Sequence, residues 1–249
     1  MMLSVIVPVD QQASGITGLK RRIHMLRSAL PYAVEVVLVD AGASAELLRH
    51  AEALGFVVVR PGLCRYGQAV RIGMLTATGV YRLLIEPGWS MPPEQVQLLL
   101  PPVLTGFDIA VASRYLPGSE RYGEPRLVHL LSRVFNRFVQ GLVLPGVVDP
   151  QCAFKVFRAD AARAVFSRTL EVGRGIDVEA LAVASSLNLR VAEVPIDWHF
   201  RNGGRPRLWV DGPDLVASVV RIRTRLSAGV YPPLGDFRPP VEKPIFPFV

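Results

Sequence analysis

The stretch Leu83-Leu84-Ile85-Glu86-Pro87-Gly88-Trp89-Ser90-Met91-Pro92-Pro93-Glu94 predicts a buried strand that runs into a loop and then into a helix. The strand is apolar without alternation, which is typical of a strand covered on both of its faces. Proline is well tolerated in the first turn of a helix, so the helix is expected to begin at the proline pair. A carboxylate, Glu86, stands where the strand ends.

The same order of strand, loop and helix recurs on both sides of this stretch. A chain that alternates buried strands with helices is expected to form an α/β fold, here a mostly parallel sheet covered by helices on both faces. The predicted elements are strand Leu3–Val9, helix Gly15–Leu30, strand Glu35–Asp40, helix Ser44–Leu54, strand Phe56–Arg60, helix Gly67–Thr78, strand Val80–Glu86, a helix from Pro92, and strand Phe107–Ala112.

The second half continues with a helix over Arg126–Leu144, a helix over Asp177–Asn188, strand Leu189–Pro195 and a last helix from Asp211 to Ser227. We expect residues 1–229 to form one domain. Proline recurs every few residues from 230 to 249, so this tail is expected to be extended, along the surface or against a partner protein.

Length and composition narrow the class of protein. The 249 residues suffice for one large core, and half of them are hydrophobic, which argues against a disordered chain. The net charge of +7 comes almost entirely from scattered arginines, without a basic arm or a zinc finger, so no nucleic-acid partner is expected. Cys64 and Cys152 lack metal-type spacing and are expected to be reduced. The N-terminus has no basic region before its apolar run, so no signal peptide is expected.

Charged residues gather at the predicted strand ends: Asp40, Arg60, Glu86 and Arg114. Open sheets of this kind bind ligands beyond the carboxyl ends of their strands, so these side chains are expected to share a cleft. A dinucleotide-binding oxidoreductase would carry Gly-x-Gly-x-x-Gly after the first strand. The sequence Val9-Asp10-Gln11-Gln12-Ala13-Ser14-Gly15 has no such motif and disfavours that class.

Several motifs in order resemble a known family. They are Val-Ile-Val-Pro, Val-Leu-Val-Asp-x-Gly, Gly-Gln-Ala-Val-Arg-x-Gly-Met, Ala-Ser-Arg-Tyr-x-x-Gly-Ser, Asp-Pro-Gln-Cys-Ala-Phe-Lys, Ile-Asp-Val-Glu and Glu-Val-Pro-Ile-Asp-Trp. Over about Leu3 to Arg225 the chain resembles family-2 glycosyltransferases of the GT-A fold. Within that family it is similar to the polyprenyl- and dolichyl-phosphate glucosyl- and mannosyl-synthases.

The resemblance implies an inverting transfer of a hexose from a UDP- or GDP-sugar to polyprenyl phosphate, performed in the cytoplasm, with the protein peripheral on the inner face of the cell membrane. Because that acceptor is already an anion, a strong general base is less necessary. The resemblance and the strand ends together assign catalytic roles to Arg114, Asp149 and Lys155, nucleotide binding to Pro8, Val9, Gln12, Asp40, Arg60 and Gly67, and the acceptor phosphate to Arg126, Arg133, Arg201 and Arg205.

The metal motif departs from the family. Where the family has Asp-x-Asp, this chain has Glu86 and Gly88, so one carboxylate is left for Mg²⁺ or Mn²⁺ and a bound metal is doubtful. Loss of several kcal/mol of leaving-group stabilisation would slow transfer by roughly a thousandfold or more. The alternative function is therefore a catalytically impaired relative that serves as a binding or partner-regulating module.

The Arg126–Leu144 helix has two interpretations. It mixes Arg126, His129, Arg133 and Arg137 with Leu, Val and Phe at helical spacing. One interpretation is a core-facing helix with a solvated basic face. The other is an interfacial helix that rests on anionic headgroups.

Overall fold

The computed structural model describes residues 2–10, 16–86, 88–200 and 208–231. Its main feature is a seven-stranded sheet of order β3-β2-β1-β4-β7-β5-β8. The strands are β1 Met2–Val9, β2 Ala33–Asp40, β3 Val57–Val59, β4 Tyr81–Leu84, β5 Ile109–Ser113, β7 Lys155–Arg158 and β8 Val191–Pro195, and a second, two-stranded sheet joins β6 Glu120–Tyr122 to β9 Asp197–His199.

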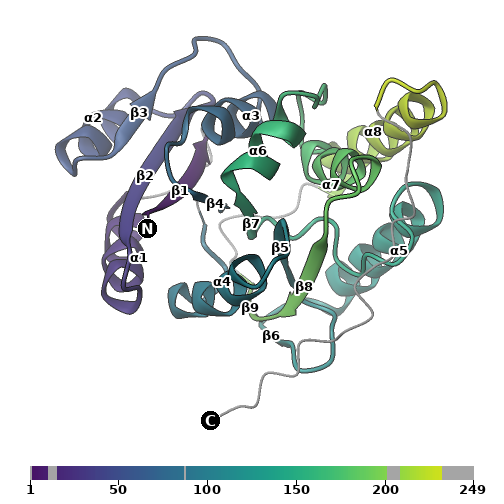
Figure 1. The fold of residues 1–249 in the computed structure, drawn as a ribbon, viewed down its shortest axis with the longest axis horizontal. Helices are drawn as coiled ribbons and strands as arrows, with labels where there is room; N and C mark the ends of the chain where they lie inside the picture. Colours follow the sequence, from purple (N-terminus) through teal and green to yellow (C-terminus); the bar gives the residue numbers. More distant parts are fainter. Residues whose placement is uncertain (1, 11–15, 87, 201–207, 232–249) are drawn as a thin grey trace.

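The helices are α1 Ile16–Ala29, α2 Ala45–Ala53, α3 Tyr66–Thr76, α4 Val96–Leu104, α5 Arg126–Leu142, α6 Ala159–Phe166, α7 Ile176–Ser186 and α8 Leu208–Ser227, with a short 3₁₀ turn over Pro93–Gln95. Helices α3 and α6 lie on one face of the sheet, with α7 packed on α6, while α1 and α4 lie on the other face (Figure 1). The predicted mostly parallel sheet with helices on both faces is thus confirmed.

Strand β7 is the part of the sheet that the sequence analysis missed. It runs antiparallel between β4 and β5, with Lys155 in register with both Leu84 and Val111. Because its direction is reversed, its first residue, and not its last, lies at the edge where the parallel strands end. This reversal brings Lys155 to the same edge as Glu86 and Arg114.

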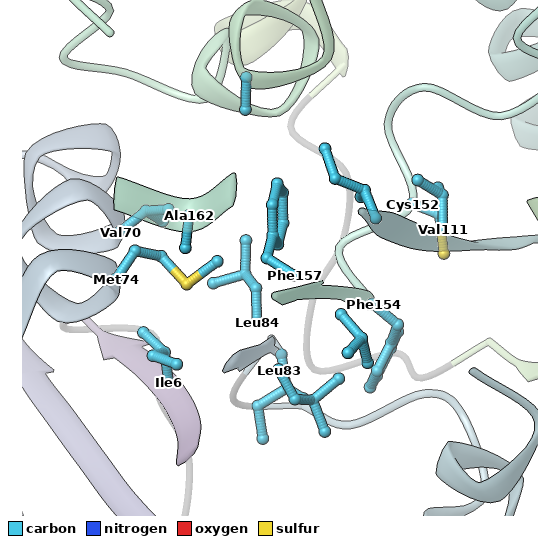
Figure 2. Packing of buried hydrophobic residues seen from close by; sticks show 14 of the residues in the cluster. Ile6, Val70, Met74, Leu83, Leu84, Val111, Cys152, Phe154, Phe157 and Ala162 are labelled. Carbon is cyan, nitrogen blue, oxygen red and sulfur yellow. The ribbon is translucent and has the colours of Figure 1, made fainter. Parts of the chain in front are cut away.

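The core lies between the sheet and its helices. Leu84 and Phe157, from adjacent strands, point toward Val70 and Met74 of α3 and Ala162 of α6 (Figure 2). The β-branched runs predicted as strands are almost wholly buried in β1, β2 and β5. Helix α6 and the β6–β9 pair were not predicted, and the tail from 232 to 249 lies outside the described residues.

Helix α8 is attached to the domain through buried carboxylates. Glu171 accepts hydrogen bonds from Arg221 and Arg225 of α8, and Glu179 of α7 accepts one from Arg225 at 3.1 Å and another from the hydroxyl of Tyr231. These contacts hold the last described residues against α7.

Candidate functional site

The loops that follow β1, β2, β4 and β5 leave the sheet at one edge, because these strands are parallel. Asp40 is the last residue of β2, Glu86 comes two residues after the end of β4, and Arg114 directly follows β5. The structure thus places these predicted residues on the same edge of one sheet.

Arg114 and Asp149 form a bidentate ion pair on this edge. The guanidinium donates from Nε to Oδ2 and from Nη2 to Oδ1, both at 2.7 Å, and the backbone N–H of Arg114 donates to Oδ2 at 3.0 Å. Asn136 of α5 donates a fourth bond at 3.3 Å. Burial raises the pKa of the Asp149 carboxyl, but the charge and hydrogen bonds of Arg114 outweigh it and hold that pKa below its ordinary value. Asp149 therefore fixes the orientation of Arg114.

Aromatic rings complete the surroundings of Arg114. Its guanidinium carbon lies 4.9 Å from the ring centre of Trp198 and 5.2 Å from that of Tyr115. Arg133 of α5 lies 5.0 Å from the same tyrosine ring. The remaining nitrogen of Arg114, Nη1, bonds to none of the described residues. Arg121 lies 5.3 Å from that ring as well, so three arginines converge on Tyr115, and Arg114 retains donors for an anionic ligand.

Lys155 and Asp177 form a second buried ion pair beside the first. The ammonium donates to Asp177 of α7 at 2.7 Å, and its side chain is 1% exposed. Cys152 links the two pairs through its backbone, because its N–H donates to the carbonyl of Asp149 at 3.3 Å and its carbonyl accepts from the ammonium of Lys155. Burial raises the pKa of its thiol to about 12. The ion pair holds Lys155 away from solvent, so its predicted contact with a ligand remains a prediction.

A third cluster gathers around the phenol of Tyr66, the first residue of α3. Arg174 lies 4.7 Å from the centre of its ring and 3.7 Å from Asp10, which follows β1. Burial raises the pKa of the Tyr66 phenol, and the charges of Asp177, Glu86 and Asp10 raise it further while Arg174 lowers it. Tyr66, Arg174 and Asp10 were not predicted as site residues. A tyrosine and an arginine 108 positions apart carry no joint signal in one sequence.

The Glu86 loop forms a tight turn with a strained residue. Trp89 has φ 43°, in the left-handed region that a bulky side chain rarely adopts, and its backbone N–H donates to the carbonyl of Glu86 at 3.0 Å. The buried indole nitrogen of Trp89 has no partner among the described residues. Backbone strain and an unpaired buried donor at one turn are features that cluster at ligand sites.

The carboxylates at this edge do not fit a metal held by protein side chains. Oε1 of Glu86 accepts from the hydroxyl and the backbone N–H of Ser90, and Gly88 supplies no side chain. Asp10 and Asp177 are paired with Arg174 and Lys155. Within the described part of the chain, no group of three histidine, cysteine, aspartate or glutamate side chains could hold an ion.

The remaining predicted nucleotide residues occupy several places. Pro8 and Val9 end β1, and Asp40 accepts from the backbone N–H groups of Gly42 and Ala43 at 2.8 Å. Gly67 is buried, and a Cβ there would come within 2.5 Å of the carbonyl oxygen of Gly173, which gives it a packing role. Arg60 is half exposed and paired with Glu52 at 2.5 Å, which directs its guanidinium to a surface carboxylate.

The predicted acceptor residues are only partly placed. Arg126 is exposed at the start of α5, and Arg133 lies against Tyr115 as described. Gln12, Arg201 and Arg205 lie outside the described residues.

Comparison with known proteins gives a family and relatives. The model of the glycosyl transferase family 2 matches residues 4–166. A dolichyl-phosphate beta-glucosyltransferase of Dictyostelium discoideum is 30% identical over 172 residues, 66% of this chain and 52% of that protein. The enzyme of the same name from Saccharomyces cerevisiae is 24% identical over 93% of this chain and 77% of its own length. The chain spans about half the length of the first two curated relatives that it matches.

Solved structures confirm the predicted GT-A fold. Glucosyl-3-phosphoglycerate synthase from Mycobacterium tuberculosis superposes with a TM-score of 0.69 at 18% identity, covering 90% of this chain and 80% of that chain, in a complex with phosphoglyceric acid. The same protein with Mn²⁺, UDP-glucose and phosphoglyceric acid gives a TM-score of 0.68 at 18% identity, with the same coverage.

Proposed function

We propose that this chain transfers a hexose from a nucleotide-sugar to polyprenyl phosphate. The chain belongs to glycosyl transferase family 2, because the model of that family matches residues 4–166. The observation that carries the proposal is the shared edge at which Asp40, Glu86 and the Arg114–Asp149 pair lie, since it is the edge where such sheets bind ligands. The curated relatives named for dolichyl phosphate support the choice of acceptor.

On the donor side, the proposal assigns the nucleotide to the ends of β1 and β2. Asp40 keeps one carboxylate oxygen, Oδ2, outside the two backbone bonds that Oδ1 accepts. Such an oxygen is suited to accept from a ribose hydroxyl. Tyr66 and Arg174 lie farther along the same edge, where a phenol and a guanidinium can meet the diphosphate.

On the acceptor side, Arg114 and Arg133 supply the positive charge, and we propose that Arg114 also contacts the diphosphate of the donor. An oxygen of the anionic polyprenyl phosphate attacks the anomeric carbon of the sugar. The bond between that carbon and the nucleoside diphosphate breaks, and the nucleoside diphosphate leaves. The demanding step is to hold two anions close together, which preorganised guanidinium groups favour electrostatically. Arg114 is preorganised by Asp149 and by the rings of Tyr115 and Trp198.

A divalent metal would supply further stabilisation of the leaving diphosphate, as the Mn²⁺ complex of the mycobacterial synthase suggests for that fold. In this chain the metal could rely on one carboxylate oxygen, Oε2 of Glu86. We therefore propose weak binding of Mg²⁺ or Mn²⁺, dependent on the diphosphate oxygens of the donor.

The second candidate function, a binding module without transfer activity, is favoured by this same lost carboxylate. Calorimetry with UDP-glucose and GDP-mannose, with and without Mn²⁺, followed by an assay with radiolabelled sugar and polyprenyl phosphate, distinguishes the candidates. Transfer supports the enzyme. Sugar-nucleotide binding without transfer supports the binding module, and no binding of either sugar nucleotide contradicts the nucleotide-sugar site itself.

We further propose that the protein meets the lipid through α5. Leu127, Leu130, Leu131 and Val134 are exposed at spacings of three and four, so they line one face of the helix, and Leu130 is 59% exposed. Arg126 and Arg137 are exposed on the same helix. An apolar face edged by arginines suits an anionic membrane surface. In the described part of the chain, no helix is both long and apolar enough to cross a bilayer.

Vesicle sedimentation tests this surface. With vesicles of phosphatidylcholine and phosphatidylglycerol, the protein is expected to sediment, and more weakly as salt rises. Leu130→Glu should abolish sedimentation, whereas Leu104→Glu, at an exposed leucine on α4, should not. Equal sedimentation of the two variants would contradict the assignment to α5. The Pro-rich tail as a site for a protein partner remains a prediction.

A further inference from the structure

Glu193 of β8 lies behind the ion pair that orients Arg114. Its two carboxylate oxygens accept from the backbone N–H groups of Val148 and Asp149, each at 2.8 Å. One carboxylate thus holds two consecutive amides of the segment that carries Asp149. The same segment is held from the other side by Asn136 and Gln140 of α5, which donate to the carbonyl of Val148 at 3.4 and 3.3 Å.

The contacts form one continuous path from β8 to the site. The carboxylate of Glu193 accepts from the backbone N–H of Asp149, and the carboxylate of Asp149 accepts two hydrogen bonds from the guanidinium of Arg114. That guanidinium in turn contacts the rings of Tyr115 and Trp198. Val111 of β5 is in register with Glu193, so pairing with β5 fixes the carboxylate on β8, the last strand of the seven-stranded sheet. Displacement of the Asp149 backbone would move both oxygens that orient Arg114.

We infer that Glu193 is a positioning residue for the phosphate-binding guanidinium of Arg114, acting through the backbone of Val148 and Asp149. The inference rests on the proposed function for the purpose of Arg114, which is to bind a phosphate of the donor or acceptor. Glu193 itself touches neither substrate. It fixes a group that does.

The charge of Glu193 makes this link sensitive to pH. Burial is the main cause that raises the pKa of Glu193 to about 7, and the negative charge of Asp149 also raises it. The two backbone hydrogen bonds lower this pKa but do not offset the effect of burial. Strand β5 and helix α4, which both pack on β8, carry no titratable side chain. Lys155 of β7 lies two strands away in the same register and is paired with Asp177. Above pH 7 the carboxylate accepts both amides. Below it, a proton occupies one oxygen and one amide loses its acceptor.

The experiment follows the Nε–H resonance of Arg114 by nitrogen-15 NMR from pH 5.5 to 8.5, assigned with Arg114→Lys. In the wild-type protein this resonance is expected to titrate near pH 7, together with the amides of Val148 and Asp149. Glu193→Gln should remove the titration. Glu179→Gln serves as the matched control, because Glu179 also accepts from two consecutive amides, those of Leu170 and Glu171, and should leave the titration intact.

A wild-type Arg114 resonance that does not titrate, or one that still titrates in Glu193→Gln, would overturn the inference, and the wild-type measurement stands even if the variant does not fold. Calorimetry with UDP-glucose separates this result from the proposed function. If the wild-type protein binds UDP-glucose, Glu193→Gln should weaken the binding by about tenfold and flatten its pH dependence. Unchanged affinity would overturn the inference. Absence of binding by the wild-type protein would contradict the proposed function and leave the NMR result to decide the positioning role.

Discussion

Replacement of Asp149 by asparagine tests the buried ion pair, because the variant keeps the shape of the side chain and removes its charge. Oδ2 accepts from the backbone N–H and Nε of Arg114, and Oδ1 accepts from Nη2 and from Asn136. In either orientation, the new amide group therefore faces two donors. Asp149 is fully buried and the side chain of Arg114 is 12% exposed, so water cannot replace the lost acceptor.

Removal of one partner from a buried ion pair costs about 3–5 kcal/mol of unfolding free energy. For a chain of this size, that corresponds to a fall in Tm of about 6–20 °C. Chemical denaturation and scanning calorimetry at pH 7 measure both. The effect should be constant down to about pH 5 and should shrink in acid, because the pKa of Asp149 is lowered and its stabilisation is lost as the pH falls through that folded-state pKa.

The matched control is Glu52→Gln, which breaks another arginine–carboxylate pair, Arg60–Glu52. Both of its side chains are about half exposed, at 46% and 45%, so no measurable change in Tm is expected. An Asp149→Asn variant as stable as the Glu52→Gln variant would refute the reasoning that the Arg114–Asp149 pair is dry and preorganised.

Two further predictions concern glycines at this edge. A Cβ at Gly67 would come within 2.8 Å of backbone atoms of residues 171–173, whereas one at Gly88 would meet nothing within 4 Å. Gly67→Ala should therefore cost about 2 kcal/mol or more by denaturation and Gly88→Ala less than about 0.5 kcal/mol, and equal costs would contradict this packing. Gly88→Asp restores a second carboxylate without a clash, so Mn²⁺ should tighten UDP binding by this variant about tenfold more than by the wild-type protein in calorimetry. An equal effect of Mn²⁺ on both proteins would show that the lost carboxylate is not what limits metal binding.

The strands whose ends share this edge could be predicted because each has a clear sequence pattern. β1, β2 and β5 are continuous apolar runs, and each ends in or is followed by a polar residue that the topology then places at one edge. Strand β7 could not be predicted in the same way. Lys155–Arg158 is four residues long with a charged residue at each end, and its place between β4 and β5 depends on long-range pairing.

The sequence predicted several site residues but not which of them contact one another. Arg114 and Asp149 were both predicted as catalytic, but their pairing depends on a loop that returns to β5 after 35 positions. Glu193 lies in Val191–Pro195, where the sequence pattern is that of a solvent-facing polar residue. In the structure it is partly buried and accepts hydrogen bonds from two backbone N–H groups. Arg60 is an example of a predicted site residue with another explanation. It follows a strand, as predicted, but its guanidinium forms a surface ion pair with Glu52.

The measurement that tests the central claim most directly is calorimetric titration of the wild-type protein with UDP-glucose and GDP-mannose, repeated with Arg114→Ala and with Asp40→Ala. The shared edge predicts that one of the two sugar nucleotides binds, with a Kd between about 1 µM and 1 mM, and that each variant weakens that same binding. Binding that both variants leave unchanged, or no binding of either sugar nucleotide at millimolar concentration, would contradict the claim that this edge of the sheet is a nucleotide-sugar site.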